Sequence, residues 1–264
     1  MMRKINILLL SLLPLLFSCD YIDENERFIV VDNHFEQPST ESVVKNVLLE
    51  DFTGQRCVNC PRGSEVIEQL QEAYPERLVA VGIHGGPLGF SGSATLVGLA
   101  TAVGDDYYHH WNLEYQPVGL VNRGDAVNYT DWMNAVRQAL TGTTALSMNL
   151  TATLHDGQVN ITVSETLKKG TYIGKLQVWL LEDGITALQM MPDGSSNRAY
   201  VHNHVLRTPV NGTWGDSFTI QEGESKQQEM TQALDTSWNP SNLSIVAFVY
   251  NDAGVEQVVK TKVK

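Results

Sequence analysis

The residues of this sequence whose types and spacing could do chemistry are two cysteines in the stretch GQRCVNCPRG, residues 54–63. Cys57 and Cys60 are separated by two residues, Pro61 follows directly, and the 264-residue chain contains 3 cysteines in all. A pair at this spacing can exchange disulfides, supply half of a metal site, or form a static cross-link.

The sequence does not favour a metal site. A structural zinc ion needs about four Cys or His ligands, which usually come as two clustered pairs. His84, His109 and His110 belong to the same part of the chain, but none of them shows the spacing of a second ligand pair. We therefore predict no metal and no bound cofactor.

Redox chemistry suits the pair better, provided that a helix begins there. The unpaired backbone N–H groups and the macrodipole of the helix N-terminus would stabilise an exposed Cys57 thiolate. That would lower the thiol pKa and make Cys57 the attacking group. Cys60, about one turn further on, would resolve the mixed disulfide. Pro61 fits the first turn, where no backbone donor is needed.

A static disulfide that pins the helix end is the alternative, because exported proteins often carry such cross-links. Closing so short a loop stabilises a fold only slightly, since the loop entropy that is removed grows with loop length. Stabilisation alone is therefore a weak reason for this spacing. We favour redox chemistry and keep the static disulfide open.

Two kinds of pattern follow each other along the chain. Strand-like and helix-like runs alternate over residues 45–142, with helical pieces expected at 63–74, 93–115 and 129–142. From residue 143, apolar and polar residues alternate around turn signals such as Asp156-Gly157. These patterns predict an α/β domain over 45–142, followed by an all-β, immunoglobulin-like sandwich over 143–264.

The segment LLEDFTGQRCVNC resembles the thioredoxin family, in which an Asp-Phe strand precedes the cysteine pair. The resemblance implies that Asp51 is the buried acid that exchanges protons with Cys60. It also implies that Pro117 is the cis-proline beside the disulfide, with the backbone of Gln116 pairing with a substrate strand. Arg56 departs from the family, which usually has Trp there. A cation at this position favours the thiolate and could contact substrate.

The N-terminus has the features of a lipoprotein signal. Residues 1–18 combine a short basic start with an apolar run, and Leu16-Phe17-Ser18-Cys19 resembles a lipobox. We expect cleavage before Cys19, lipidation of that cysteine, and an acidic tether over 19–44. An ordinary signal peptide is the alternative. The net charge of −12 argues against nucleic acid as a partner.

The lipobox, EDFTGQRCVNCP and the downstream YVHNHVLR together resemble Bacteroidetes lipoproteins related to outer membrane protein twenty-eight. This resemblance implies an outer membrane lipoprotein without a settled activity, for which adhesion or another surface role has been suggested. The acidic residues after Cys19 also resemble a surface-export signal, although a short acidic run is often a solvated linker.

Four further residues were weighed as site candidates. His202 and His204 alternate as on one face of a strand, and hydrogen-bonding roles suit them better than metal binding. Trp214 and Trp238 could stack on a sugar, but tryptophans in loops more often cover the edge of a core.

These observations lead to two hypotheses about function. In the first, Cys57, Cys60 and Asp51 catalyse thiol–disulfide exchange on exported proteins, with Arg56, Gln116 and Pro117 contacting the substrate. In the second, the chain is a cell-surface binding or adhesion protein in which the thioredoxin-like fold is a scaffold and the sandwich recognises the partner. The sequence leaves open whether the protein is an enzyme.

Overall fold

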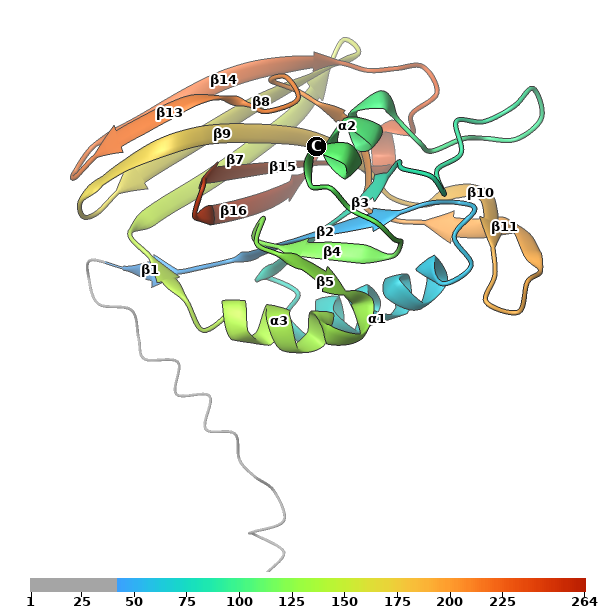
Figure 1. Cartoon of the computed structure of the whole chain (residues 1–264). Coiled ribbons are helices and arrows are strands. Elements are labelled where there is room, and N and C mark those ends of the chain that lie inside the picture. Colours follow the sequence, from blue (N-terminus) through green and yellow to red (C-terminus); the bar gives the residue numbers. More distant parts are fainter. Residues whose placement is uncertain (1–41) are drawn as a thin grey trace, which may run out of the picture. The chain divides into compact units, whose positions relative to one another are not determined.

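Two neighbouring strands, β2 (Val47–Thr53) and β3 (Leu78–His84), lie at the centre of the fold (Figure 1). Every residue of both strands is buried, and the strands pair in parallel from Val47 opposite Leu78 to Thr53 opposite His84. Strands buried on both faces need a covering layer on each side. The computed structural model describes residues 42–264, and the signal peptide, Cys19 and tether residues 19–41 lie outside that range.

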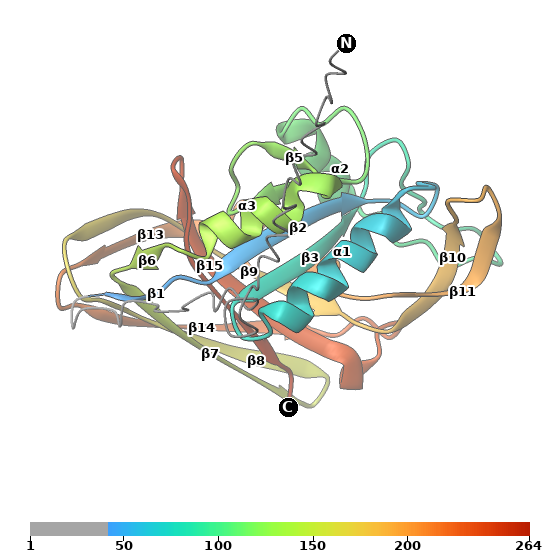
Figure 2. The same ribbon diagram turned by 90° about the horizontal axis from the view of Figure 1, so that it is seen from below.

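One face of these strands is covered by helices. α1 (Cys60–Ala73) connects β2 to β3, and α3 (Trp132–Ala139) follows the short 3-10 helix η1 (Tyr129–Asp131). Figures 1 and 2 show α1 and α3 on the same side of the sheet. Their apolar side chains pack with the odd-numbered side of β2, as the alternation of a strand requires. This cluster contains Val47, Leu49, Ile67, Leu70, Trp132 and Val136.

The opposite face is covered partly by α2 (Ala102–His110) and partly by the second half of the chain. Phe52 and Val81 pack in one cluster with Tyr107 of α2 and with Trp179 and Phe248 from far along the sequence. The first and second halves of the chain therefore share a core.

The main sheet joins the two halves as well. β4 (Val118–Val121) and β5 (Ala126–Asn128) extend it beyond β2. On the other side, β12 (Val205–Pro209) runs parallel to β3, with Val205 opposite Gly82, and antiparallel to β9 (Thr171–Glu182). β15 (Leu243–Asn251) and β16 (Gly254–Lys262) follow after the 3-10 helix η2 (Pro240–Asn242). The order is β16-β15-β9-β12-β3-β2-β4-β5, and β13 (Asp216–Gln221) also pairs with β9 to complete the 9-stranded sheet.

Three smaller sheets complete the described residues. β7 (Leu146–His155), β8 (Gln158–Leu167) and β14 (Ser225–Ala233) form a three-stranded sheet whose apolar face packs on β9 and β15. β10 (Ile185–Met190) and β11 (Ser196–His202) form a hairpin that pairs only with itself. β1 (Val43–Val44), at the end of the predicted tether, pairs with β6 (Thr143–Thr144).

The predicted fold class, an α/β thioredoxin-like domain followed by an immunoglobulin-like sandwich, is wrong. The described chain is mostly β, and its largest sheet runs without interruption from β5 to β16. The pairing of β12 with β3 causes the difference, because it places a strand from the second half directly beside the first. The hairpin turn at Asp156-Gly157 is confirmed, whereas residues 93–101, expected to be helical, are irregular. No helix within residues 42–264 is long and apolar enough to cross a membrane.

The shared core leads to a prediction about truncation. Expressed alone, residues 42–142 should not unfold cooperatively, because Phe52 and Val81 would lose the Trp179 and Phe248 side chains that bury them. Urea unfolding followed by circular dichroism checks this, with residues 42–264 as the control. A cooperative transition of the short segment would contradict the single shared core.

Candidate functional site

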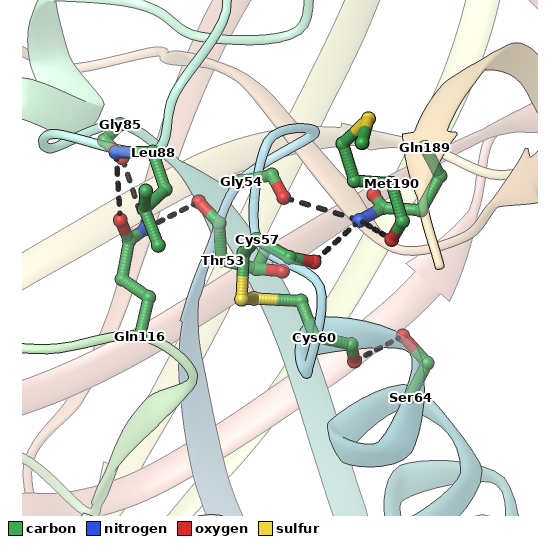
Figure 3. Close-up of a disulfide and its surroundings, with 10 residues drawn as sticks. All are labelled: Thr53, Gly54, Cys57, Cys60, Ser64, Gly85, Leu88, Gln116, Gln189 and Met190. Atoms are coloured by element: carbon green, nitrogen blue, oxygen red, sulfur yellow. Dashed lines mark hydrogen bonds between the residues drawn. A yellow bond between two sulfur atoms is a disulfide. The ribbon is translucent and has the colours of Figure 1, made fainter. Parts of the chain in front are cut away.

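The cysteine pair lies where β2 leads into α1, as expected. Cys57 is in the turn after β2, Cys60 is the first residue of α1, and the two form a disulfide (Figure 3). Pro61 occupies the first turn of the helix. Cys57 is only 1% exposed and Cys60 only 2%, so the expectation of an exposed Cys57 is wrong.

The β10–β11 hairpin helps to enclose the pair. The Gln189 side chain reaches from β10 and donates hydrogen bonds to the carbonyl oxygens of Cys57, at 2.8 Å, and Gly54, at 3.3 Å (Figure 3). The backbone N–H of Met190 donates to the Gln55 carbonyl at 2.9 Å. We call the β10–β11 hairpin the cover of the cysteine pair. The sequence did not predict it, because the hairpin is more than a hundred residues from the cysteines and resembles an ordinary sandwich hairpin.

Gln55 ties a second segment to the same turn. Its side-chain nitrogen donates to the carbonyls of Leu188 in β10 and Val97, at 2.9 and 3.0 Å. Its side-chain oxygen accepts from the N–H of Leu99 at 2.8 Å. Gln55 is completely buried, so it joins the hairpin and the 97–99 segment to the cysteine turn. Such a fully satisfied amide favours one arrangement of the three segments.

The outer surface of the turn remains accessible. Arg56, Val58 and Asn59 are exposed, and the Arg56 guanidinium carbon lies 5.2 Å from the centroid of the Phe90 ring. A partner could therefore contact the turn while the sulfur atoms stay covered. The role of Arg56 in substrate binding stays a prediction.

Pro117 lies beside the start of α1, and its bond to Gln116 is cis, which confirms the expected isomer. A Cβ atom placed on Gly63, in the first turn of α1, would lie 3.4 Å from the Cβ of Pro117. The Gln116 side chain donates to the carbonyls of Thr53 and Gly85 at 2.7 and 3.0 Å (Figure 3). Gln116 thus positions the loop around the disulfide, and its backbone pairing with a substrate stays a prediction.

Asp51 lines a small cavity of about 30 Å³ that Cys60 also lines. It is 2% exposed, and burial raises its pKa from 3.8 to about 8. Its Oδ1 atom has no hydrogen-bond partner among the described residues. A protonated carboxyl next to the second cysteine matches the role that the resemblance implied.

Two buried histidines line the same cavity. The rings of His84, at the end of β3, and His202, at the end of β11, lie 5.3 Å apart. Burial lowers the pKa of His84 well below 6.5 and that of His202 to about 4, so both are neutral at pH 7. His84 Nδ1 and His202 Nε2, like Asp51 Oδ1, are buried and make no hydrogen bond within the described part of the chain.

Three buried polar atoms of residues that line this cavity are thus without a hydrogen-bond partner among residues 42–264. His204 lines the cavity too, and burial lowers its pKa to about 4. Across residues 42–264, no group of three or more His, Cys, Asp or Glu residues could hold a metal ion. Sequence reasoning considered these histidines separately. The signal it lacked was the pairing of β12 with β3, which brings His202 and His204 to His84.

The raised pKa of Asp51 leads to a prediction about pH and stability. Between about pH 4 and pH 8 the folded protein holds a proton that the unfolded chain has released, so this residue lowers stability as the pH rises through that window. The Asp51→Asn variant has no carboxyl group to titrate, so it does not lose this stability as the pH rises. In urea unfolding of the oxidised protein, we expect the variant to be more stable than the wild type by about 3–5 kcal/mol at pH 9 and by far less at pH 4.5.

The matched control is Asp125→Asn, at an exposed carboxylate. Its stability relative to the wild type should change little between pH 4.5 and pH 9. If the effect of Asp51→Asn were also independent of pH, Asp51 would not be protonated in the folded protein.

Comparisons with known proteins support the fold and the family. HBP35 of Porphyromonas gingivalis is similar to this chain with a TM-score of 0.67 and 19% identity, covering 84% of this chain and 76% of its own. That likeness extends across both halves of the chain, in agreement with the continuous sheet. A domain of the outer membrane lipoprotein Omp28 from Porphyromonas gingivalis is 28% identical, covering 46% of this chain and 89% of its own, with a TM-score of 0.34. No curated protein matches the chain.

The family model described as outer membrane protein Omp28 matches residues 104–264, which include Pro117 and Gln189 but not the two cysteines. The match covers more than half of the chain and agrees with the resemblance seen in the sequence. The chain therefore belongs to the outer membrane protein Omp28 family, which confirms the predicted outer membrane localisation.

Proposed function

We propose that this outer membrane lipoprotein carries out thiol–disulfide exchange on exported proteins, at a disulfide that is covered at rest. The observation that carries the proposal is the convergence of three groups at the start of α1. Asp51 and Cys60 of the disulfide line one small cavity, and Pro117, which precedes β4, lies against the first turn of the same helix. A disulfide that served only as a static cross-link would not require a buried carboxylic acid near it.

The oxidised form would accept two electrons from a substrate dithiol. A substrate thiolate attacks the Cys57 sulfur, the bond between Cys57 and Cys60 breaks, and Cys60 leaves as a thiolate with the bonding electron pair. Asp51, mostly protonated at pH 7 because its pKa is about 8, gives its proton to Cys60 through the cavity. A second substrate thiolate then attacks the mixed disulfide at the substrate sulfur and releases Cys57.

Attack on Cys57 requires the cover to move. The β10–β11 hairpin is a two-stranded sheet of its own, and such hairpins are only marginally stable without support. Its contacts with the cysteine turn include the hydrogen bonds of Gln189, Met190 and Gln55 described above. Local opening of this hairpin therefore needs less free energy than unfolding of the main sheet.

A surface binding protein is the second candidate, and the burial of Cys57 favours it. A sulfur that is never exposed can only cross-link, and the surrounding surface would then serve a partner instead of a reaction. The two candidates differ in whether the disulfide reacts while the protein stays folded.

Gln189→Ala tests the proposal, because it removes the hydrogen bonds to Cys57 and Gly54 without touching either sulfur. We expect the variant to oxidise a model dithiol peptide about thirtyfold faster than the wild type, since each of the two lost bonds stabilised the closed hairpin by about 1 kcal/mol. The rate is measured by mass spectrometry of the peptide. Gln227→Ala, at an exposed position of β14, is the matched control and should react like the wild type.

Cys57→Ser should abolish the reaction in both backgrounds. If neither the wild type nor Gln189→Ala oxidised the peptide while both remained folded by circular dichroism, the disulfide would be static. The surface binding protein would then be the remaining candidate.

A further inference from the structure

A second site lies on the other face of β2. Neighbouring residues of a strand point to opposite faces, so Glu50 faces away from the Asp51 cavity. Glu50 pairs with Arg123, which lines an open groove of about 670 Å³. That volume is within the range of small-molecule sites. The groove is formed by the end of α2, the β4–β5 turn, the start of β9, the segment around Trp214 and the β15–β16 turn.

The backbone is strained where it places Arg123. Asn122 and Arg123 both have positive φ angles, 53° and 59°, a region that asparagine tolerates but that is unfavourable for arginine. Asn122 is held there by β2 and β16. Its side chain accepts from the N–H of Leu48 at 2.9 Å, and its carbonyl accepts from the N–H of Val255 at 2.9 Å. Strain maintained by such support is common at functional sites.

The Arg123 guanidinium has unused hydrogen-bonding capacity. It is 5% exposed, and its Nε atom contacts Glu50 Oε1 at 3.3 Å. Neither Nη atom has a hydrogen-bond partner among the described residues. The rings of Tyr250 and Phe248 lie 4.1 and 4.7 Å from the guanidinium carbon, and they stabilise its charge without offering an acceptor. Buried charged donors without partners are costly, and a planar carboxylate matches both Nη atoms at once.

The Trp214 side of the groove is positioned by packing before any ligand binds. Trp214 packs against His110, with ring centroids 4.2 Å apart, and its carbonyl accepts a hydrogen bond from the Tyr250 hydroxyl at 2.7 Å. The hydroxyl of Tyr107 donates to the neighbouring Thr213 carbonyl. The Trp214 ring, held by this packing, loses little entropy when a ligand packs on it.

We propose that this groove binds an acidic sugar, a unit of a glycan that contains uronic acid. The sugar carboxylate pairs with Arg123, and a ring face packs on the aromatic wall at Trp214. The side chains of Lys175, Asn251 and Asp252 also line the groove and offer hydrogen bonds to ring hydroxyls. Because both Nη atoms are buried, the carboxylate enters only when the Tyr250 ring above the guanidinium shifts.

The test compares an acidic sugar probe with its neutral methyl ester. Titration calorimetry of the full mature chain with a galacturonic acid trimer, and with its methyl-esterified neutral form, measures both dissociation constants. We expect the acid to bind at least about tenfold more tightly than the ester. Equal binding of the two probes, or no saturable binding of the acid, would overturn the proposal.

Variants locate the site. Lys175→Gln and Trp214→Ala should each weaken binding of the acid by about tenfold, and Arg123→Lys should remove the preference for acid over ester. Lys262→Gln, at an exposed lysine outside the groove, is the matched control and should bind like the wild type. If the Arg123→Lys variant does not fold, the dissociation constants of Lys175→Gln and Trp214→Ala test the location of the site instead. Unchanged binding in both would contradict the assignment.

Cys57→Ser should bind the trimer as the wild type does, because the cysteines do not line the groove. Failure of sugar binding is therefore distinguishable from failure of the redox proposal.

Discussion

The pairing of β12 with β3 is the constraint on which the rest of this structure depends. The Gly82 N–H donates to the His204 carbonyl at 2.8 Å, and Val205 lies opposite Gly82. Through this short parallel contact, β9, β15 and β16 continue the sheet that β2 and β3 begin. Their apolar side chains then bury the even-numbered face of β2, which no helix covers completely. This one contact between residues far apart in the sequence thus joins the α/β-patterned and the β-patterned parts of the chain into a single fold.

Both candidate sites follow from that constraint. β12 begins just after the β10–β11 hairpin, so the pairing holds the hairpin against the cysteine turn and brings His202 to His84. On the opposite face, the strands that arrive with β12 carry the aromatic rings that surround Arg123. Asp51 and Glu50, adjacent in β2, therefore contribute to two different sites. Each carboxyl group is buried, and burial raises the pKa of both, with Arg123 opposing the rise at Glu50.

Much of the local structure could be predicted from the sequence, because it depends on nearby residues. The start of α1 at the cysteine pair and the turn at Asp156-Gly157 follow from short motifs, and the burial of Asp51 was implied by the resemblance to the thioredoxin family. The cover over Cys57 could not be predicted, since Gln189 is one polar residue in an alternating strand with nothing to mark its partner. Arg123 was missed for a similar reason. It lies in a polar turn, and only its positive φ angle and the distant rings show that it points inward.

The claim that the disulfide is intact but covered is tested most directly by its rate of reduction. Full-length protein and an oxidised peptide of residues 54–63 are treated with the same small thiol under native conditions, and the appearance of free thiols is followed. We expect the protein to react at least about a hundredfold more slowly than the peptide, because attack must wait for the hairpin to open. Equal rates for the protein and the peptide would show that Cys57 is accessible, and would contradict the account.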